Sequence, residues 1–223
     1  MSDDLLFASY TALKAQPSRS EGLTEDVAVK EVQELLVDWN DRVRTRGVYS
    51  TVGFTAAADL VLWWVSDSAQ HLQDLTVAFR RTQLGRALDE VEVMLGLVRP
   101  AEFAKDHLPA FAKGELPKSY LCVYPFVRTP EWYLLDPRER EALLREHGEA
   151  GREFPDVLAN TTSAFGLGNY EWILAFEADG LDRIVELIRR LRATGARRYT
   201  KLETPFFTGA RTDLAHAVAT IPR

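Results

Sequence analysis

The apolar positions of the chain repeat at two spacings, and the order of those spacings occurs twice. Alternation with a period of two residues is typical of half-buried strands, whereas repeats at three and four residues are typical of helices. In the first half the pattern predicts strands over residues 5–15, 48–55, 59–66 and 91–98, and helices over residues 25–44 and 69–88. The predicted order is strand, helix, strand, strand, helix, strand.

The second half repeats this order after a connector, residues 99–118, that contains Pro and Gly. The pattern predicts strands over residues 119–128, 156–168, 171–178 and 198–207, and helices over residues 136–149 and 181–193. The two halves share this order without obvious residue identity. We therefore expect an α+β protein of two ferredoxin-like halves in one chain, residues 1–112 and 113–223.

Composition and charge limit the possible functions. The chain has 223 residues, 46% of them hydrophobic and 27% charged, which suffices for one large domain or two small ones. A formal charge of -6 argues against a broad nucleic-acid surface. The beginning of the chain does not resemble a secretory signal, and the apolar run at residues 59–68 is too short to cross a bilayer, so we expect a cytoplasmic protein without membrane contact. Cys122 is the only cysteine, which excludes disulfide frameworks and Cys-rich metal sites.

A histidine ends the apolar stripe of the helix predicted over residues 136–149. Asp136 and Pro137 form a good start signal, and Leu143 and Leu144 lie one turn before His147, so the imidazole should point inward. A helical histidine on an apolar face is more often a hydrogen-bonded core residue than a ligand. The helix alone leaves both interpretations open.

The strand before this helix also allows two interpretations. Unless Pro125 introduces a bulge, alternation places one set of side chains on a single face: Tyr120, Cys122, Tyr124, Phe126 and Arg128. This set could be the inner face of an ordinary half-buried strand, or one wall of a pocket for a large aromatic anion. The basic run Arg189, Arg190, Arg192, Arg197 and Arg198 supplies the local positive charge that an acidic protein needs to bind an anion.

Several linked motifs in the second half resemble the chlorite dismutase family, specifically its actinobacterial coproheme decarboxylase branch. They are "VYPFVRTPEWYLLDPRERE", "LLREHGEAGREFPDVLANT", "LGNYEWILAFEA", "LIRRLRATGARRY" and "TPFFTG". The resemblance continues more weakly through the first half. It implies two ferredoxin-like halves per subunit, a homopentamer, and porphyrin iron bound in the second half.

The activity implied by the resemblance is the last step of haem b synthesis by the coproporphyrin route. Hydrogen peroxide oxidises iron coproporphyrin III (coproheme), and the propionates at positions 2 and 4 become vinyl groups with loss of carbon dioxide. Coproheme is thus both substrate and redox cofactor, and haem b is the product. A coproporphyrin ferrochelatase is a possible transient partner that supplies the substrate.

The resemblance also assigns roles to individual residues. His147 matches the proximal iron ligand, Tyr124 the tyrosine that abstracts hydrogen from the reacting propionate, and His107 the distal base for peroxide. On local sequence alone, His107 would be an exposed loop histidine. The residues that match positions around the porphyrin and its propionates are Arg128, Trp132, Trp172 and Arg192.

Two positions depart from the patterns of related proteins. Members that split chlorite carry a distal arginine at the position of Ala159, so we do not expect chlorite conversion. Gly195 stands where the family leads us to expect an acidic residue, which leaves the shape of the substrate entrance open.

Two other classes of function remain possible at this stage. A haem-carrying or haem-sensing protein, or another haem peroxidase of the family, would need His147 and the basic residues but not the pair Tyr124 and His107. An interaction domain without a cofactor would need none of them.

Overall fold

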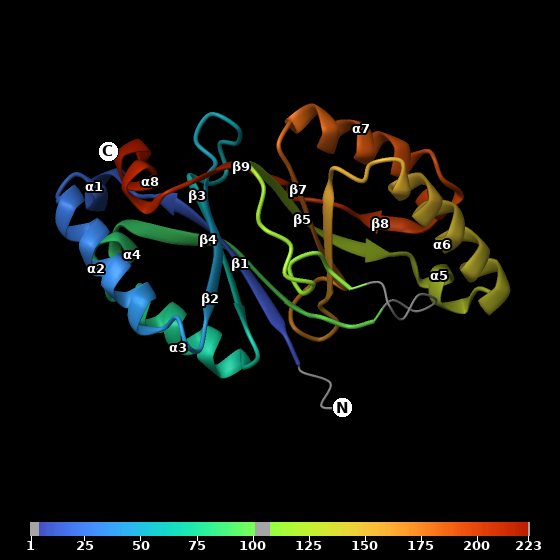
Figure 1. Ribbon diagram of the computed structural model, residues 1–223, viewed down its shortest axis with the longest axis horizontal. Helices are drawn as coiled ribbons and strands as arrows, with labels where there is room; N and C mark the ends of the chain where they lie inside the picture. Colours follow the sequence, from blue (N-terminus) through green and yellow to red (C-terminus); the bar gives the residue numbers. More distant parts are fainter. Residues whose placement is uncertain (1–4, 101–107, 223) are drawn as a thin grey trace. The chain divides into compact units, whose positions relative to one another are not determined.

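A computed structural model describes residues 5–100 and 108–222, and within them the chain forms two compact units (Figure 1). The first contains residues 5–97 together with 207–222. The second contains the described residues between 98 and 206. Each unit has an antiparallel sheet and helices, which confirms the expected α+β class.

The first unit has five strands in the order β4-β1-β3-β2-β9. Their bounds are β1 (Phe7–Ala15), β2 (Arg44–Ser50), β3 (Leu60–Ser66), β4 (Leu88–Leu97) and β9 (Phe207–Thr212). The helices are α1 (Pro17–Ser20), α2 (Glu25–Asp38), α3 (Ala69–Phe79), α4 (Gln83–Ala87) and α8 (Leu214–Thr220). One core cluster joins strands and helices, with Leu62 and Trp64 of β3 packed among side chains such as Val32, Leu75 and Val218.

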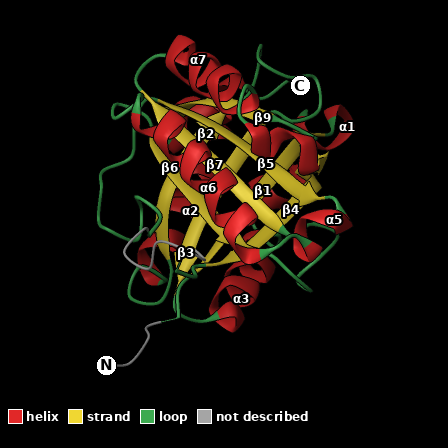
Figure 2. Cartoon of the chain, turned by 90° about the vertical axis from the view of Figure 1, so that its right-hand side faces the viewer, coloured by secondary structure: helices red, strands yellow, loops and turns green. Residues whose placement is uncertain are grey.

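The second unit has four strands in the order β6-β7-β5-β8. They are β5 (Tyr120–Arg128), β6 (Leu158–Ser163), β7 (Trp172–Ala178) and β8 (Thr200–Leu202). The remaining elements are α5 (Pro130–Leu134), α6 (Pro137–Arg152), α7 (Leu181–Arg192) and a 3-10 helix, η1 (Gly195–Tyr199). Figure 2 shows α6 and α7 in front of the strands of this unit.

The helix predicted over residues 69–88 is two helices, so that prediction was wrong in its extent. The break follows Phe79, where the Thr82 hydroxyl accepts a hydrogen bond from the Gly85 amide and donates one to the Phe79 carbonyl. Thr82 therefore caps α4 as a new helix. Gly85 fits this corner because a Cβ there would lie 2.0 Å from the Phe79 carbonyl oxygen.

The first predicted helix was also too long, because α2 ends at Asp38 and β2 begins at Arg44. The strand predicted over residues 48–55 corresponds to β2, which begins four residues earlier than predicted and ends at Ser50. The turn that follows contains Gly53 with a φ of 84°, a conformation that favours glycine. In the sequence, the helical spacing of apolar residues continues across the junction between α2 and β2, so the pattern did not mark the end of the helix.

The end of the chain differs most from the expectation. Residues 198–207, predicted as one strand, form the end of η1, the short strand β8 and the first residue of β9. Strand β9 pairs with β2, and three residues of α8, Leu214, Ala217 and Val218, are buried in the core of the first unit. Residues 207–222 therefore pack with the first unit, whereas the sequence had suggested that they belong to the second half.

Candidate functional site

Three side chains of the predicted set on β5, Tyr120, Cys122 and Tyr124, pack with residues of helix α7. Its pairing with β7 runs without a shift from Tyr120 to Phe126, so Pro125 introduces no bulge in this ladder. Cys122 and Tyr124 belong to a core cluster with Phe176, Ile184 and Leu187. The irregularity in β5 lies later, between Val127 and Arg128, where the strand pairs with β8.

Tyr124 lies deep in this cluster, with 3% of its surface exposed. Its ring centroid is 4.3 Å from that of Phe206 and 6.2 Å from that of Phe176. Burial raises the pKa of the Tyr124 phenol far above its usual value, and the nearby Cys122 and Glu203 raise it further. The phenol is therefore protonated at every physiological pH, as a hydrogen donor must be.

Helix α6 positions His147. Asp136 caps the helix as expected, because its side chain accepts a hydrogen bond from the Arg138 amide. His147 is half-buried, and its Nδ1 lies 3.2 Å from Oγ1 of Thr194, which follows α7. Thr194 was not among the predicted residues.

The surroundings of His147 favour a neutral imidazole. Burial lowers its pKa to about 4, and the positive charge of Arg128 acts in the same direction, whereas Glu146 raises it. A neutral imidazole is the form that binds metals, so near neutral pH the ring is in the correct state to hold iron.

This lowered pKa leads to a prediction about stability. Between about pH 6.5 and pH 4 the unfolded chain binds a proton at His147 that the folded protein does not bind, so the free energy of unfolding should decrease as the pH falls through that window. The decrease should be about 1.4 kcal/mol per pH unit and on the order of 3 kcal/mol in total. Denaturant titrations of the ligand-free protein at several pH values measure it.

In the same titrations, His147→Gln should lack this part of the pH dependence. His216→Gln, at an exposed position of the first unit, controls for the exchange of a histidine itself. Identical slopes for the wild type and His147→Gln would contradict the prediction.

One short segment, Thr194 to Tyr199, contacts four of the predicted or neighbouring site residues. Thr194 contacts His147, the Gly195 amide donates to Glu146 at 3.0 Å, and the Ala196 carbonyl accepts a hydrogen bond from Nη1 of Arg128 at 2.8 Å. The Tyr199 ring lies 5.6 Å from that of Trp132. The segment therefore connects α6 to the end of β5 and to α5.

Two arginines and one glutamate form a second cluster close to Tyr124. Glu203 accepts a hydrogen bond from Arg192 at 2.8 Å and forms an ion pair with Arg197 at 2.5 Å, and its own side chain is 14% exposed. The Arg192 guanidinium lies 5.9 Å from the Phe206 ring, which stacks on Tyr124. Both arginine side chains are 42% exposed, so an anion can reach them.

Arg128 and Trp132 are more enclosed than the sequence suggested. The Arg128 guanidinium lies 4.7 Å from the Phe126 ring and 4.2 Å from the Trp132 ring, and burial lowers the pKa of Arg128 to about 10. Trp132 is 5% exposed. These contacts fix the end of β5 against α5 and η1, and carboxylate binding by Arg128 remains a prediction.

Trp172 lies at the start of β7, opposite Phe126. Its ring meets the Phe165 ring edge to face at 5.3 Å, and Phe165 in turn lies 6.0 Å from Tyr133. Because alternate residues of β7 share a face, Trp172 lies on the same face as Leu174 and Phe176. A place for Trp172 beside a porphyrin stays a prediction.

Three other histidines remain, at positions 71, 107 and 216. His107 lies outside the described residues. His71 lies on α3 and His216 on α8, both in the first unit.

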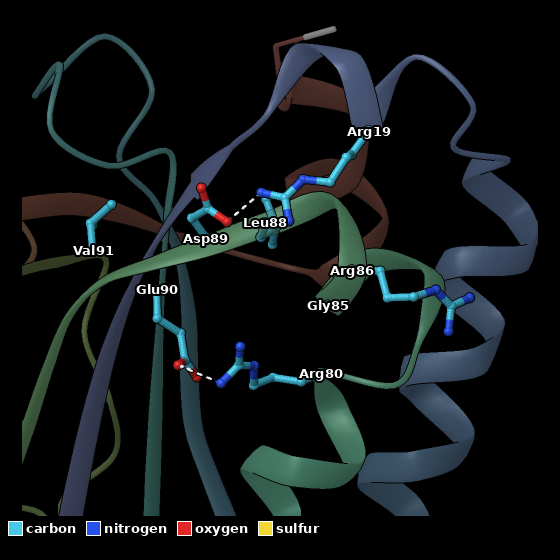
Figure 3. A pocket seen from close by; sticks show the side chains of 8 residues that line it. All are labelled: Arg19, Arg80, Gly85, Arg86, Leu88, Asp89, Glu90 and Val91. Atoms are coloured by element: carbon cyan, nitrogen blue, oxygen red, sulfur yellow. Dashed lines mark hydrogen bonds and ion pairs between the residues drawn. The ribbon is translucent and has the colours of Figure 1, made fainter.

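A surface hollow of about 690 Å³ lies in the first unit, and none of the predicted site residues lines it. Figure 3 shows the side chains that do. Two of its arginines already pair with carboxylates, Arg19 with Asp89 and Arg80 with Glu90. Its charges are thus largely balanced within the protein.

Sequence reasoning missed Thr194, Glu203 and Phe206 as neighbours of the site. Thr194 is 47 positions from His147 in the chain, and Glu203 is an ordinary charge in the sequence. Arg197 was noticed only as part of the basic run. Only the fold brings these side chains together.

Residues 25–212 match the chlorite dismutase family model. The chain belongs to the chlorite dismutase family. The family assignment thus confirms the resemblance seen in the motifs of the second half.

Curated relatives within the family carry a more specific name. The chain is 52% identical over 204 residues to the coproheme decarboxylase of Mycolicibacterium smegmatis, covering 90% of this chain and 88% of that protein. It is 27% identical over 165 residues to the coproheme decarboxylase of Oceanobacillus iheyensis, covering 65% of this chain and 66% of the relative.

Solved structures of the family share the fold. The chlorite dismutase of Candidatus Nitrospira defluvii in complex with imidazole superposes with a TM-score of 0.86, at 22% identity, over 98% of this chain and 95% of that one. At this identity the likeness concerns the fold alone. Among the described residues, none of the helices has the length and apolar character needed to span a membrane.

Proposed function

We propose that this family member is a coproheme decarboxylase, which uses hydrogen peroxide to convert propionates 2 and 4 of iron coproporphyrin III to vinyl groups and gives haem b. The observation that carries the proposal is the 52% identity, over 90% of the chain, to a coproheme decarboxylase. Tyr124 and His147, the residues that the chemistry needs, are both present.

The described residues fit a bound iron porphyrin. His147 offers a neutral imidazole, the cluster around Tyr124 offers apolar and aromatic surface, and Arg192 and Arg197 offer positive charge. We assign His147 as the iron ligand, and Trp132, Trp172 and Arg128 as residues that line or support the porphyrin site. When coproheme is bound, its iron would allow hydrogen peroxide to oxidise each propionate by two electrons.

Tyr124 supplies the hydrogen-abstracting group. Its buried phenol keeps its proton in the resting protein, so the hydroxyl can lose a hydrogen atom during turnover and recover one from the reacting propionate. The cluster around the ring keeps water away from the phenoxyl oxygen. Arg192 and Arg197, next to this ring, would hold substrate carboxylates so that a propionate lies within reach.

His107 supplies the base in this proposal. A neutral imidazole can accept the proton of hydrogen peroxide as the peroxide binds. Ala159 on β6, which stands where chlorite-splitting members have an arginine, supports decarboxylation rather than chlorite conversion as the reaction.

Peroxide titration of the coproheme complex, followed by mass spectrometry of the porphyrin, tests the function directly. We expect two successive losses of carbon dioxide. Binding of coproheme with a shifted Soret band but without mass loss would indicate a haem-binding protein of the family instead.

The arginine pair yields a prediction about substrate affinity. A hydrogen bond to a charged group contributes about 1.5–3 kcal/mol, and because both guanidiniums are partly exposed we expect the lower end, roughly a tenfold loss of coproheme affinity for each arginine replaced by alanine. The double variant of Arg192→Ala and Arg197→Ala should lose more affinity for coproheme, with four carboxylates, than for haem b, with two. Spectroscopic titration measures both.

Arg189→Ala is the matched control for the arginine pair. Arg189 lies on α7, as Arg192 does, is 73% exposed and pairs with Glu186. Its loss should therefore leave the affinities for coproheme and haem b unchanged. Equal effects of Arg189→Ala and Arg192→Ala would remove the arginine pair from the substrate site.

Several finer features belong to the same proposal. We infer that each unit is ferredoxin-like, because the strands of each follow the order expected for that fold when numbered within the unit.

We further propose a cytoplasmic homopentamer that receives coproheme from a ferrochelatase. Light scattering would measure the assembly in solution.

A further inference from the structure

Two consecutive residues after α7 contact two consecutive residues of α6. Thr194 Oγ1 lies 3.2 Å from Nδ1 of His147, and the Gly195 amide donates to Oε2 of Glu146 at 3.0 Å. Thr194 is 3% exposed, so water does not compete freely for its hydroxyl. The pairing of the His147 ring with Thr194 is thus enclosed in the protein.

The direction of the hydrogen bond between Thr194 and His147 follows from the single proton of the hydroxyl. The Thr194 hydroxyl donates to the Leu191 carbonyl at 2.7 Å, and a carbonyl oxygen can only accept. The longer contact to His147 must then be one in which the hydroxyl oxygen accepts, so the imidazole carries its proton on Nδ1.

We propose that Thr194 is a positioning residue that fixes His147 in the Nδ1–H tautomer and so directs the lone pair of Nε2 toward the porphyrin iron. This inference rests on the proposed function for its consequence, since it assumes that His147 is the iron ligand. The tautomer itself is a property of the ligand-free chain. Histidine side chains in water carry the proton mainly on Nε2, so the site reverses the ordinary preference.

Gly195 allows the close approach on which this contact depends. A Cβ at position 195 would lie 2.8 Å from Cδ2 of Leu143 and 3.1 Å from Oε2 of Glu146, so the ends of these two side chains would have to shift to admit it. Position 195 carries glycine where the family resemblance predicts an acidic residue. The Gly195 amide contacts Glu146, and the neighbouring Thr194 hydroxyl lies beside His147.

The first test uses the ligand-free protein labelled with ¹⁵N in its histidines. In the wild type, the resonance assigned to His147 by its loss in His147→Gln should show a protonated Nδ1 and an unprotonated Nε2. Thr194→Val, which keeps the shape and removes the hydroxyl, should return the ring to the Nε2–H form. Thr194→Ser should keep the Nδ1–H form.

Thr162→Val is the matched control for the loss of a buried threonine hydroxyl. Thr162 lies on β6, is 1% exposed, and its hydroxyl has no hydrogen-bond partner among the described residues. It should leave the His147 signals unchanged. An Nε2–H ring in the wild type, or no tautomer change in Thr194→Val, would overturn the proposal.

The second test separates this inference from the proposed function. In the reduced coproheme complex, Thr194→Val should lower the frequency of the iron–imidazole stretching vibration, and it should weaken coproheme binding by roughly tenfold, the lower end of what loss of such a partner costs. Thr194→Ser should keep both near the wild-type values.

The variant His147→Ala tests the ligand assignment itself. If it leaves the iron spectrum unchanged while Thr194→Val still switches the tautomer, His147 is not the iron ligand and the proposed site fails, but the role of Thr194 in the ligand-free protein stands. If His147→Ala removes the iron–imidazole band and Thr194→Val does not shift it, the role of Thr194 fails and the ligand assignment stands.

Discussion

Tyr124→Phe should bind coproheme almost as tightly as the wild type and produce hardly any haem b. The substitution keeps the ring in its cluster with Phe176 and Phe206 and removes only the hydroxyl, so the fold and the pocket should persist. The chemistry loses its hydrogen donor. By comparison with the loss of other proton-transferring side chains, we expect decarboxylation to slow by on the order of 100-fold to 10,000-fold.

Single-turnover reactions with peroxide, followed by mass spectrometry of the porphyrin, measure this effect. Tyr120→Phe is the control, because Tyr120 lies on the same strand and packs against the same core cluster. A rate of haem b formation in Tyr124→Phe close to that of Tyr120→Phe would mean that another residue abstracts the hydrogen.

His107→Ala should bind coproheme normally but react slowly with peroxide near neutral pH. Peroxide reacts productively with ferric iron after losing a proton, and little of it is ionised in neutral water, so a base beside the iron accelerates this step. General base catalysis typically contributes ~100-fold to 10,000-fold. The variant should regain part of its rate as the pH rises, because the solvent then supplies more hydroperoxide anion.

In the wild type, the rate of reaction with peroxide should instead fall at low pH. A protonated imidazole cannot act as a base, so the rate should fall as the pH is lowered and His107 becomes protonated. Stopped-flow oxidation of both proteins across the range provides the comparison. Superimposable profiles would make His107 an ordinary loop residue and leave Tyr124 and His147 as the reacting pair.

Two elements of the candidate site, β5 and α6, were predictable because each depends on local pattern. The start of α6 at Asp136 and Pro137 follows from capping chemistry, and the face of β5 that carries Tyr124 follows from alternation. Both signals span only a few residues. Sequence alone could therefore place His147 and Tyr124 on their elements.

The partners of these side chains were not predictable for the same reason. Thr194 meets His147, and Glu203 joins Arg192 to Arg197, through the packing of η1 and β8 against α6 and β5. The enclosure of Arg128 between two aromatic rings likewise depends on α5, which the pattern did not predict. The signal for α5 was present in Pro130, at the first helical position.

The return of residues 207–222 to the first unit determines how the gene can be divided. A single cut near residue 98 would leave the N-terminal fragment without strand β9, without the buried side chains Leu214, Ala217 and Val218 of α8, and without the buried Ile221 that follows them. During synthesis, the ribosome must likewise complete the entire second unit before the last strand of the first becomes available. The first unit could be expressed separately as a rearranged chain that omits the second unit. In that chain, residues 207–222 would come first and a linker would join them to residues 5–97.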